Sequence, residues 1–272
     1  MYSELRGKVV IITGSTSGIG RAIALGFAKK GCKIILNGLE KAEIVKKVMD
    51  EVNNVAHTGK DQNSLHPQIL FHPANMKKPN EIEDLVNFAV KNFGKIDILI
   101  NNAGIQHVSP IEDFPADKWQ DIIDINLSAS FHMIKFSLPF MMVNGWGRII
   151  NIVSAHGLVA SPFKSAYVAA KHGLIGLTKT VALETAQKNI TCNAICPGYV
   201  RTSLVEKQIL DQAKAHNIPA EKVVDDIILA PQPIKKFVEM EDIAEAAIFL
   251  SLSSARSITG IALPIEGGWT AR

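Results

Sequence analysis

Residues 8–20, which read KVVIITGSTSGIG, decide the fold of this chain. The run from 8 to 13 is rich in Val and Ile and stops at a glycine, which is typical of a short buried strand. Residues 19–31 follow with apolar side chains at helical spacing up to a closing glycine. A strand, a glycine-rich turn and a helix in this order let backbone N–H groups and a helix N-terminus bind a pyrophosphate. The glycines are spaced G-x3-G-x-G, so the turn by itself is a weak signal.

The same alternation of apolar runs with helical patterns continues along the chain. Further strands are predicted at residues 33–37, 68–74, 96–104, 146–154, 189–198 and 258–268. Helices are predicted at about 40–53, 80–93, 117–143 and 165–186. Continuous Val/Ile/Leu strands that alternate with helices indicate a parallel sheet covered on both faces. No shift in composition suggests a second domain.

Composition limits the class of protein. The chain has 272 residues, of which 47% are hydrophobic, so it can bury a large core. Its formal net charge is only +3 and Lys77–Lys78 is a bare pair, so nucleic acid is not expected as a partner. The N-terminal residues lack the apolar region of a signal peptide, and no apolar run is long enough to cross a bilayer. We therefore predict a cytoplasmic protein with no membrane partner.

The three cysteines do not predict a disulfide or a metal site. Cys192 and Cys196 lie four apart in a predicted strand, which separates their Cα atoms by roughly 13 Å, too far for a disulfide. A metal site would need further ligands, and the neighbouring residues supply none. Reduced, buried thiols are the expectation.

Two segments interrupt the alternation. Residues 54–67 are polar and predicted as a surface loop, in which His57 and His66 are too irregularly spaced for a metal site. Residues 199–236 are longer than a normal connection and contain two amphipathic stretches, at 203–217 and 220–230, bounded by prolines. Long insertions after a strand of an α/β sheet often cover a site, so we predict a substrate lid there.

Several motifs occur together in one order: TGSTSGIG (13–20), NNAG (101–104), Asn126 in DINL, Ser154 before Tyr167-x3-Lys171, and PG (197–198). In this combination the chain resembles the short-chain dehydrogenase/reductase family over essentially its whole length. The resemblance implies an α/β fold made of a single Rossmann-type doubly wound domain over residues 1–272, with a seven-stranded parallel sheet and the helical lid at 199–236. It also implies a homotetramer.

The residues at the end of the second predicted strand determine whether NAD or NADP is preferred. A carboxylate there would bind the adenosine ribose hydroxyls of NAD, and an arginine would meet the 2′-phosphate of NADP. Residues 36–41 read LNGLEK, with neither group at the strand end. We predict NAD, with Asn37 or the backbone near Gly38–Leu39 at the ribose; Glu40 and Lys41 leave NADP open. The expected cofactor-binding residues are Thr13, Gly14, Ser15, Thr16, Gly18, Ile19, Gly20, Asn37, Leu39, Asn75, Met76, Asn102, Ala103, Gly104, Tyr167, Lys171, Pro197, Gly198, Val200 and Thr202.

The expected catalytic residues are Asn126, Ser154, Tyr167 and Lys171. Ser154 ends an apolar strand, at the sheet edge where ligands bind. Tyr167 and Lys171 are four apart on a helix, so they share a face. The ammonium is expected to lower the pKa of the phenol, which makes Tyr167 a general base for an alcohol and a general acid in the reverse reaction. Ser154 would hold the reacting oxygen, and the family resemblance gives Asn126 a water-linked proton path.

A further set of residues predicts the substrate. Gln106, Ser154, His156, Lys164, Tyr167, Tyr199, Gln208 and Trp269 are the expected substrate-binding residues. The set resembles that of the D-3-hydroxybutyrate dehydrogenases within this family, in which such positions bind a carboxylate and a methyl end. Close relatives usually carry Trp where this chain has Tyr199. A fixed cation, amide and imidazole donors, and apolar walls suit a small hydroxy acid.

Two alternatives remain open at this point. A 3-oxoacyl thioester reductase or another short-chain alcohol dehydrogenase would use the same catalytic residues, and the absence of basic residues in TGSTSG and LNGL argues against NADPH. A non-catalytic dinucleotide-binding protein on this fold would bind NAD without turnover. The presence of all four expected catalytic residues, Asn126, Ser154, Tyr167 and Lys171, argues against it.

Overall fold

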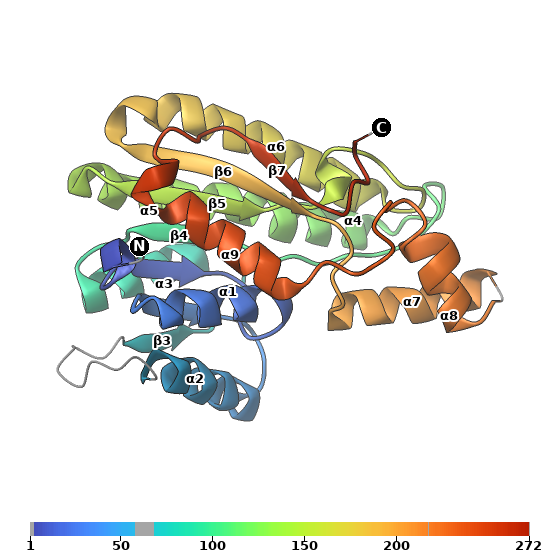
Figure 1. Cartoon of the computed structure of the whole chain (residues 1–272), viewed down its shortest axis with the longest axis horizontal. Helices are drawn as coiled ribbons and strands as arrows, with labels where there is room; N and C mark the ends of the chain where they lie inside the picture. Colours follow the sequence, from blue (N-terminus) through green and yellow to red (C-terminus); the bar gives the residue numbers. More distant parts are fainter. Residues whose placement is uncertain (1–2, 58–67, 217, 272) are drawn as a thin grey trace.

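A seven-stranded parallel sheet forms the centre of the computed structural model, which describes residues 3–57, 68–216 and 218–271 (Figure 1). The strands run in the spatial order β3-β2-β1-β4-β5-β6-β7. They are β1 (Val9–Ile12), β2 (Lys33–Asn37), β3 (Ile69–His72), β4 (Ile98–Asn101), β5 (Gly147–Ile152), β6 (Ile190–Pro197) and β7 (Ala262–Ile265). The predicted parallel sheet of seven strands is confirmed. The bounds predicted for β2 are confirmed, and the other strands are shorter than the predicted runs because the flanking residues of those runs lie outside the sheet ladder.

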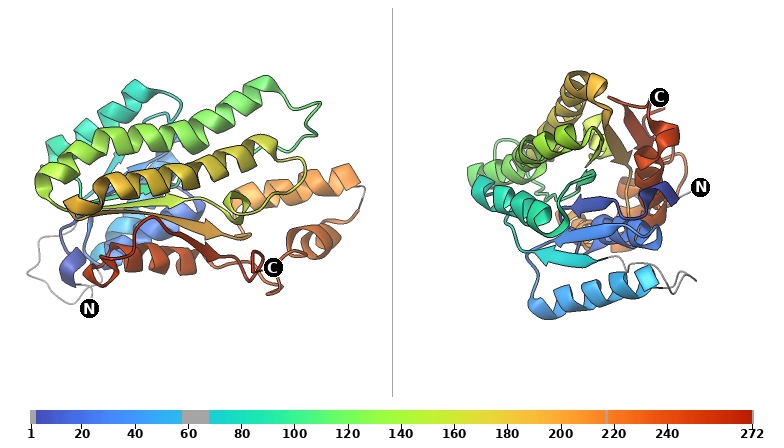
Figure 2. Two further views of the ribbon diagram at one scale, coloured as in Figure 1. Left: turned by 90° about the horizontal axis from the view of Figure 1, so that it is seen from above. Right: turned by 90° about the vertical axis from the view of Figure 1, so that its left-hand side faces the viewer.

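Helices cover both faces of the sheet (Figure 2). One face carries α1 (Gly18–Lys29), α2 (Ala42–His57) and α9 (Met240–Ser251). The other carries α3 (Pro79–Phe93), α5 (Ala129–Asn144) and α6 (Ser165–Thr185), with α4 (Ala116–Ile123) leading into α5. The sheet therefore buries Val and Ile side chains on both sides, which explains why its strands read as continuous apolar runs.

Three details differ from the sequence-based expectation. The helix predicted at 117–143 is α4 and α5 joined by a π-helical turn, Asp124–Ser128, which a 3.6-residue period does not predict. Helix α9 was not predicted at all. The loop predicted at 54–67 is wrong for residues 54–57, which continue α2 because the apolar positions Val52 and Ala56 still pack on the core. Residues 58–67 lie outside the described residues.

The sheet order places the glycine turn beside the NNAG motif. From β1 the chain builds the sheet first toward β3 and then, from β4 onward, in the opposite direction. The turns after β1 and β4 therefore lie side by side at a topological switch point, where parallel sheets bind ligands. Thr13 Oγ1 accepts hydrogen bonds from Asn102 N (2.9 Å) and Ala103 N (3.0 Å) and joins the two turns.

A second, smaller group of helices lies beyond the carboxyl ends of the strands (Figure 1). It contains α7 (Ser203–His216) and α8 (Ala220–Val223), which continues as a π-helical turn, Val224–Ile228. These helices have an apolar cluster of their own, here called the lid cluster, which consists of Tyr199, Val205, Ile209, Val223, Ile228 and Leu229. The predicted helical pair at 203–217 and 220–230 is confirmed for its described residues. Within the described ranges, no helix is long and apolar enough to cross a membrane.

Candidate active site

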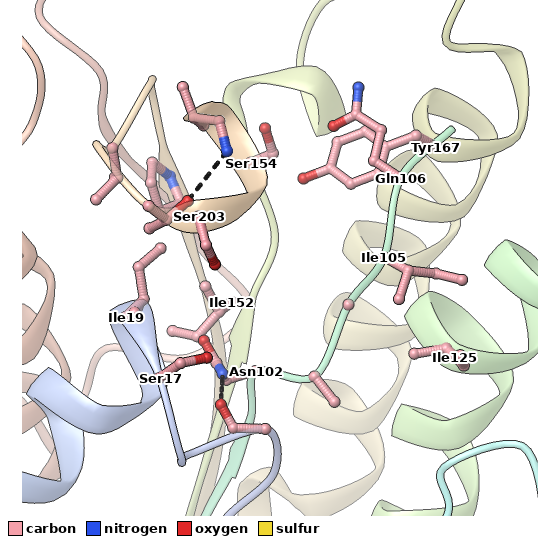
Figure 3. Close-up of a pocket in the computed structure, with 18 of the residues that line it drawn as sticks. Ser17, Ile19, Asn102, Ile105, Gln106, Ile125, Ile152, Ser154, Tyr167 and Ser203 are labelled. Carbon is pink, nitrogen blue, oxygen red and sulfur yellow. Dashed lines mark hydrogen bonds between the residues drawn. The ribbon is translucent and has the colours of Figure 1, made fainter. Parts of the chain in front are cut away.

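A cavity of about 370 Å³ runs along the carboxyl ends of the strands, from the turn after β1 to Trp269 (Figure 3). Its walls include most of the predicted cofactor residues: Gly14, Gly18, Ile19, Asn37, Leu39, Asn75, Met76, Asn102, Ala103, Gly104, Tyr167, Lys171, Pro197, Gly198, Val200 and Thr202. They also include every predicted substrate residue: Gln106, Ser154, His156, Lys164, Tyr167, Tyr199, Gln208 and Trp269. The sheet thus brings the two predicted sets together in one continuous space.

The cofactor end of this cavity is shaped by backbone that admits no Cβ atom. A Cβ at Gly20 would collide with the carbonyl oxygen of Gly14 and lie 2.5 Å from Asn102 Nδ2. Gly14 itself has a φ of 59°, in the left-handed region that favours glycine. The N-cap of α1, Ser17, makes no side-chain bond to the helix, so its side chain does not satisfy the N–H groups of the first turn, and Ser17, Gly18 and Ile19 line the cavity. These residues fit a dinucleotide, whose pyrophosphate a helix N-terminus favours.

Four predicted cofactor residues do not line the cavity and instead support it: Thr13, Ser15, Thr16 and Gly20. Ser15 N donates to Asn37 O (2.8 Å), and Ser15 Oγ accepts from Asn37 N (2.9 Å), so the glycine turn is fixed to the end of β2. Gly20 lets α1 approach that turn. Thr16 is buried, and its Oγ1 has no hydrogen-bond partner among the described residues.

Two of the asparagines predicted to bind the cofactor, Asn37 and Asn75, have internal partners. Asn37 Oδ1 accepts from Gly14 N (3.2 Å), and its Nδ2 donates to His72 O (3.0 Å) and Ala74 O (2.9 Å). Asn75 Oδ1 accepts a hydrogen bond from Lys77 N (3.0 Å). These amides therefore organise the cavity wall. The backbone at Gly38–Leu39 remains the part of this segment that can face a ribose.

Tyr167 and Lys171 lie one turn apart on α6, and Tyr167 points toward Ser154 at the end of β5 (Figure 3). Lys171 Nζ donates to Ile152 O (2.8 Å) and lies 5.6 Å from the centre of the Tyr167 ring. Burial raises the pKa of Tyr167 to about 12, with the Ser154 hydroxyl opposing the shift, and burial lowers the pKa of Lys171 to about 8. The expected lowering of the Tyr167 pKa is therefore wrong in this structure, because removal of the phenolate from water is the largest influence on that pKa.

Asn126 lies in the π-helical turn between α4 and α5 and does not line the cavity. Its Oδ1 accepts from Ile105 N (2.9 Å) and its Nδ2 donates to Ile105 O (2.9 Å). The side chain thus holds the strand-like segment that follows NNAG, and with it Gln106. Helical turns of this kind occur often at functional sites. The amide's two bonds give Asn126 a positioning contact, whereas its expected place in a proton path stays a prediction.

The substrate end is built from side chains that contact one another. Lys164 Nζ donates to Tyr199 Oη (2.9 Å), and the Tyr199 ring stacks on Trp269 with centres 5.5 Å apart and planes 9° apart. Gln208 Nε2, from α7, donates to Gln106 Oε1 (2.6 Å). Gln106 Nε2 and Gln208 Oε1 are buried without partners among the described residues. Burial lowers the pKa of Lys164 to about 8, so it remains mostly charged at neutral pH.

His156 lies between two serines. Its Nδ1 is 3.4 Å from Ser154 Oγ, and its Nε2 is 2.9 Å from Ser161 Oγ. Burial, with Lys164 and His172 adding to it, lowers the pKa of His156 to about 3, so the ring is neutral. Sequence reasoning missed Ser161, because a loop serine at no fixed offset gives no signal. It also left out Ile105 and Val205, two apolar wall residues.

Comparisons with known proteins agree with this geometry. The model of the short chain dehydrogenase family matches residues 8–213. The chain is 53% identical over 265 residues to D-beta-hydroxybutyrate dehydrogenase of Rhizobium meliloti (strain 1021), covering 97% of this chain and 99% of that protein. It is 47% identical over 268 residues to the protein of the same name from Cupriavidus necator, covering 98% and 100%. A solved actinorhodin polyketide ketoreductase with NADPH is similar at a TM-score of 0.89, with 29% identity and 98% of each chain covered.

Proposed function

The chain belongs to the short-chain dehydrogenase family, and from this premise we propose that it oxidises D-3-hydroxybutyrate to acetoacetate, reversibly, with NAD. One observation carries the proposal: a buried cation, Lys164, lies at the same end of the cavity as Ser154 and Tyr167, together with the buried amide donor Gln106 Nε2, which has no partner among the residues that the structure describes. A short acid fits this arrangement because its carboxylate needs the donors while its hydroxyl needs the phenol. The two relatives at 53% and 47% identity, both named for this activity, support it.

The side chains of this cavity can carry the proton chemistry of such a reaction. The alcohol loses a proton from oxygen and a hydride from carbon, and when bound, the nicotinamide cofactor supplies the hydride acceptor. As the phenolate, Tyr167 takes the hydroxyl proton, and as the phenol it returns that proton in the reverse direction. Ser154 holds the reacting oxygen by a hydrogen bond. Lys171 Nζ donates to Ile152 O, which places the ammonium beside the Tyr167 ring, where it stabilises the phenolate that accepts the proton.

The choice of NAD rests on charge at the ribose end of the cavity. The carboxylate of Glu40 lines the cavity next to Gly38, and the glycine turn from Ser15 to Ser17 carries no cation. A 2′-phosphate would meet this carboxylate instead of an arginine, which disfavours NADP. Glu40, rather than an acid at the end of β2, is thus the residue that we assign to this preference.

Assembly, location and lid closure extend the proposal. Large apolar side chains are exposed along α5 and α6, among them Phe131, Met142 and Leu183. Large exposed apolar side chains on two helices favour association, which we propose gives a homotetramer. The three cysteines are free and buried, which suits the cytoplasm. Residues 199–236 would act as the lid, since Gln208 on α7 reaches Gln106 across the substrate end of the cavity.

A spectrophotometric screen tests the proposed function. Purified protein is given NAD or NADP with D- and L-3-hydroxybutyrate, lactate and secondary alcohols, and formation of the reduced cofactor is followed. We expect turnover to be fastest with NAD and D-3-hydroxybutyrate. Preference for NADPH with a 3-oxoacyl thioester would instead identify a reductase, and tight NAD binding without turnover of any alcohol would identify a non-catalytic protein.

A further inference from the structure

We propose that Ser161 is a positioning residue: its hydroxyl donates to Nε2 of His156, keeps the imidazole proton on Nδ1, and so leaves the Ser154 hydroxyl free to donate to the reacting oxygen. The inference rests on the proposed function through the role of Ser154. Ser161 lies in the loop before α6 and does not line the cavity.

The His156 ring is held in one orientation. It is 4% exposed, and it meets Trp269 edge to face with ring centres 5.0 Å apart and planes at 86°. The rings of Tyr167 and Tyr199 also meet it edge to face, with ring centres 5.9 and 6.2 Å away. Aromatic neighbours on several sides prevent rotation without repacking. Each ring nitrogen therefore faces one serine only: Nδ1 faces Ser154 and Nε2 faces Ser161.

A neutral imidazole has one donor and one acceptor, so the two serines cannot have the same role. If Nδ1 is the acceptor, the Ser154 proton points at the ring and none is left for a substrate oxygen. If Nδ1 carries the proton, Ser154 Oγ accepts from Nδ1 and from the backbone N–H of His156 (3.1 Å). Its own proton is then free for the reacting oxygen. This second tautomer requires a donor at Nε2, and Ser161 lies there at 2.9 Å.

The loop geometry fixes Ser161 at that point. Pro162 and Phe163 form the turn that follows it, and Phe163 has a φ of 65°, in the left-handed region that a bulky side chain rarely adopts. Ser109 N donates to Phe163 O (3.0 Å) and anchors the turn from the opposite loop. One turn thereby presents Ser161 to His156 and Lys164 to the cavity. Strained conformations of this kind are common where a site needs fixed side chains.

Nitrogen-15 NMR of the imidazole groups tests the proposal directly, without substrate. The His156 signals are assigned by their loss in His156→Gln. We expect the wild-type ring to carry its proton on Nδ1. In Ser161→Ala the ring should become a mixture of tautomers, because Nε2 has lost its donor. Ser165→Ala is the matched control, since Ser165 begins α6, four residues further along, and its Oγ has no partner among the described residues, so the substitution should not change the tautomer.

Kinetics give a second readout. In Ser161→Ala, kcat should fall about two- to tenfold, the preference that one net hydrogen bond confers. The affinity for NADH should not change, and Ser161→Thr, which keeps the hydroxyl, should restore most of kcat. A wild-type ring protonated on Nε2, or a tautomer unchanged in Ser161→Ala, would overturn the proposal. A parallel loss of NADH affinity would assign Ser161 a general structural role and overturn it too.

The tautomer result stands apart from the proposed function. If the wild type fails to oxidise 3-hydroxybutyrate but shows the Nδ1 proton and its loss in Ser161→Ala, the substrate assignment fails and the positioning role holds. If the acid is oxidised but the tautomer is the other one, the positioning role fails alone.

Discussion

The two ends of the cavity are built by different means. At the cofactor end, glycines and backbone groups define the space, and the polar side chains that support it, Asn37 and Thr13, have internal partners. At the substrate end, the space is defined by side chains that bond to one another, as Lys164 does to Tyr199 and Gln208 to Gln106.

This difference indicates how each end responds to its ligand. The cofactor end is preformed, so binding there requires little rearrangement. At the substrate end, a carboxylate can accept a further hydrogen bond from Lys164 and one from Gln106 Nε2, which has no partner among the described residues, so the side-chain contacts there must adjust. Substitutions at the substrate end should therefore alter selectivity between substrates, whereas the cofactor end should tolerate a change of one exposed charge.

The largest effect is expected at the junction of the two ends. Tyr167→Phe removes the proton carrier, so kcat should fall at least about a hundredfold, the typical contribution of a general acid–base group. The affinity for NADH, measured by fluorescence titration, should stay near the wild-type value. Retention of more than a tenth of wild-type kcat would contradict the role of the phenol.

Lys164→Ala should show most clearly that the two ends of the cavity act separately, because it should weaken substrate binding and leave NAD binding unchanged. Loss of a charge-assisted hydrogen bond, worth about 1.5–3 kcal/mol, should lower kcat/KM for 3-hydroxybutyrate roughly ten- to a hundredfold. The KM for NAD should hardly change. A neutral alcohol such as 2-butanol is the matched control, because it has no charge for Lys164 to bind. Equal losses with both substrates would show that Lys164 is not the partner of the carboxylate.

The charge on Lys164 also predicts a pH dependence at the substrate end. Its pKa is lowered to about 8, so the KM for 3-hydroxybutyrate should rise as pH rises through 8, approaching about tenfold per pH unit. The stability of the fold should instead increase with pH. Between about 8 and the ordinary lysine value of 10.5, the unfolded chain binds a proton that the folded chain has released, so the Lys164 contribution to the free energy of unfolding rises with pH. Initial rates across pH 6.5–9.5, roughly the titration range of such a group, measure the rise in KM. Lys164→Ala should lack the rise.

The smallest effect is expected from Glu40→Gln at the cofactor end. The carboxylate is exposed, so removing it should improve the affinity for NADPH relative to NADH by only about two- to fivefold. Glu43→Gln, an exposed acid on α2 that does not line the cavity, should leave the ratio unchanged. An identical ratio in Glu40→Gln and wild type would place the NAD preference elsewhere, in the backbone at Gly38–Leu39.

Much of the fold could be predicted because it depends on local patterns. Continuous Val/Ile runs predict buried parallel strands, and the i, i+4 spacing of Tyr167 and Lys171 places both side chains on one face of α6. Helix α9 was missed, although its apolar positions, such as Ile243 and Ala247, pack against α1. The π-helical turn at Asn126 was missed because its period differs from that of the helices it joins.

The site was less predictable where a role depends on distant partners. Asn37 is expected at the ribose, but its amide donates to His72, the last residue of β3, and to Ala74 beyond it, 35 and 37 residues away. The expected low pKa of Tyr167 assumed a pairwise interaction with Lys171, whereas burial, which only the assembled fold supplies, has the larger influence. Ser161 acts on His156 through a turn whose geometry follows from the left-handed Phe163.

Two aromatic rings lie where the lid cluster meets the substrate end of the cavity, and they link substrate affinity to local unfolding of α7 and α8. Tyr199 belongs to the lid cluster, Trp269 packs on it, and both line the cavity. A ligand that orders these rings stabilises α7 and α8 against local unfolding by the free energy with which it binds at the concentration used. Each tenfold increase in the ratio of ligand concentration to dissociation constant therefore slows the opening-dependent hydrogen exchange of these helices about tenfold. The exchange rates of α7 amides thus measure substrate affinity without any turnover.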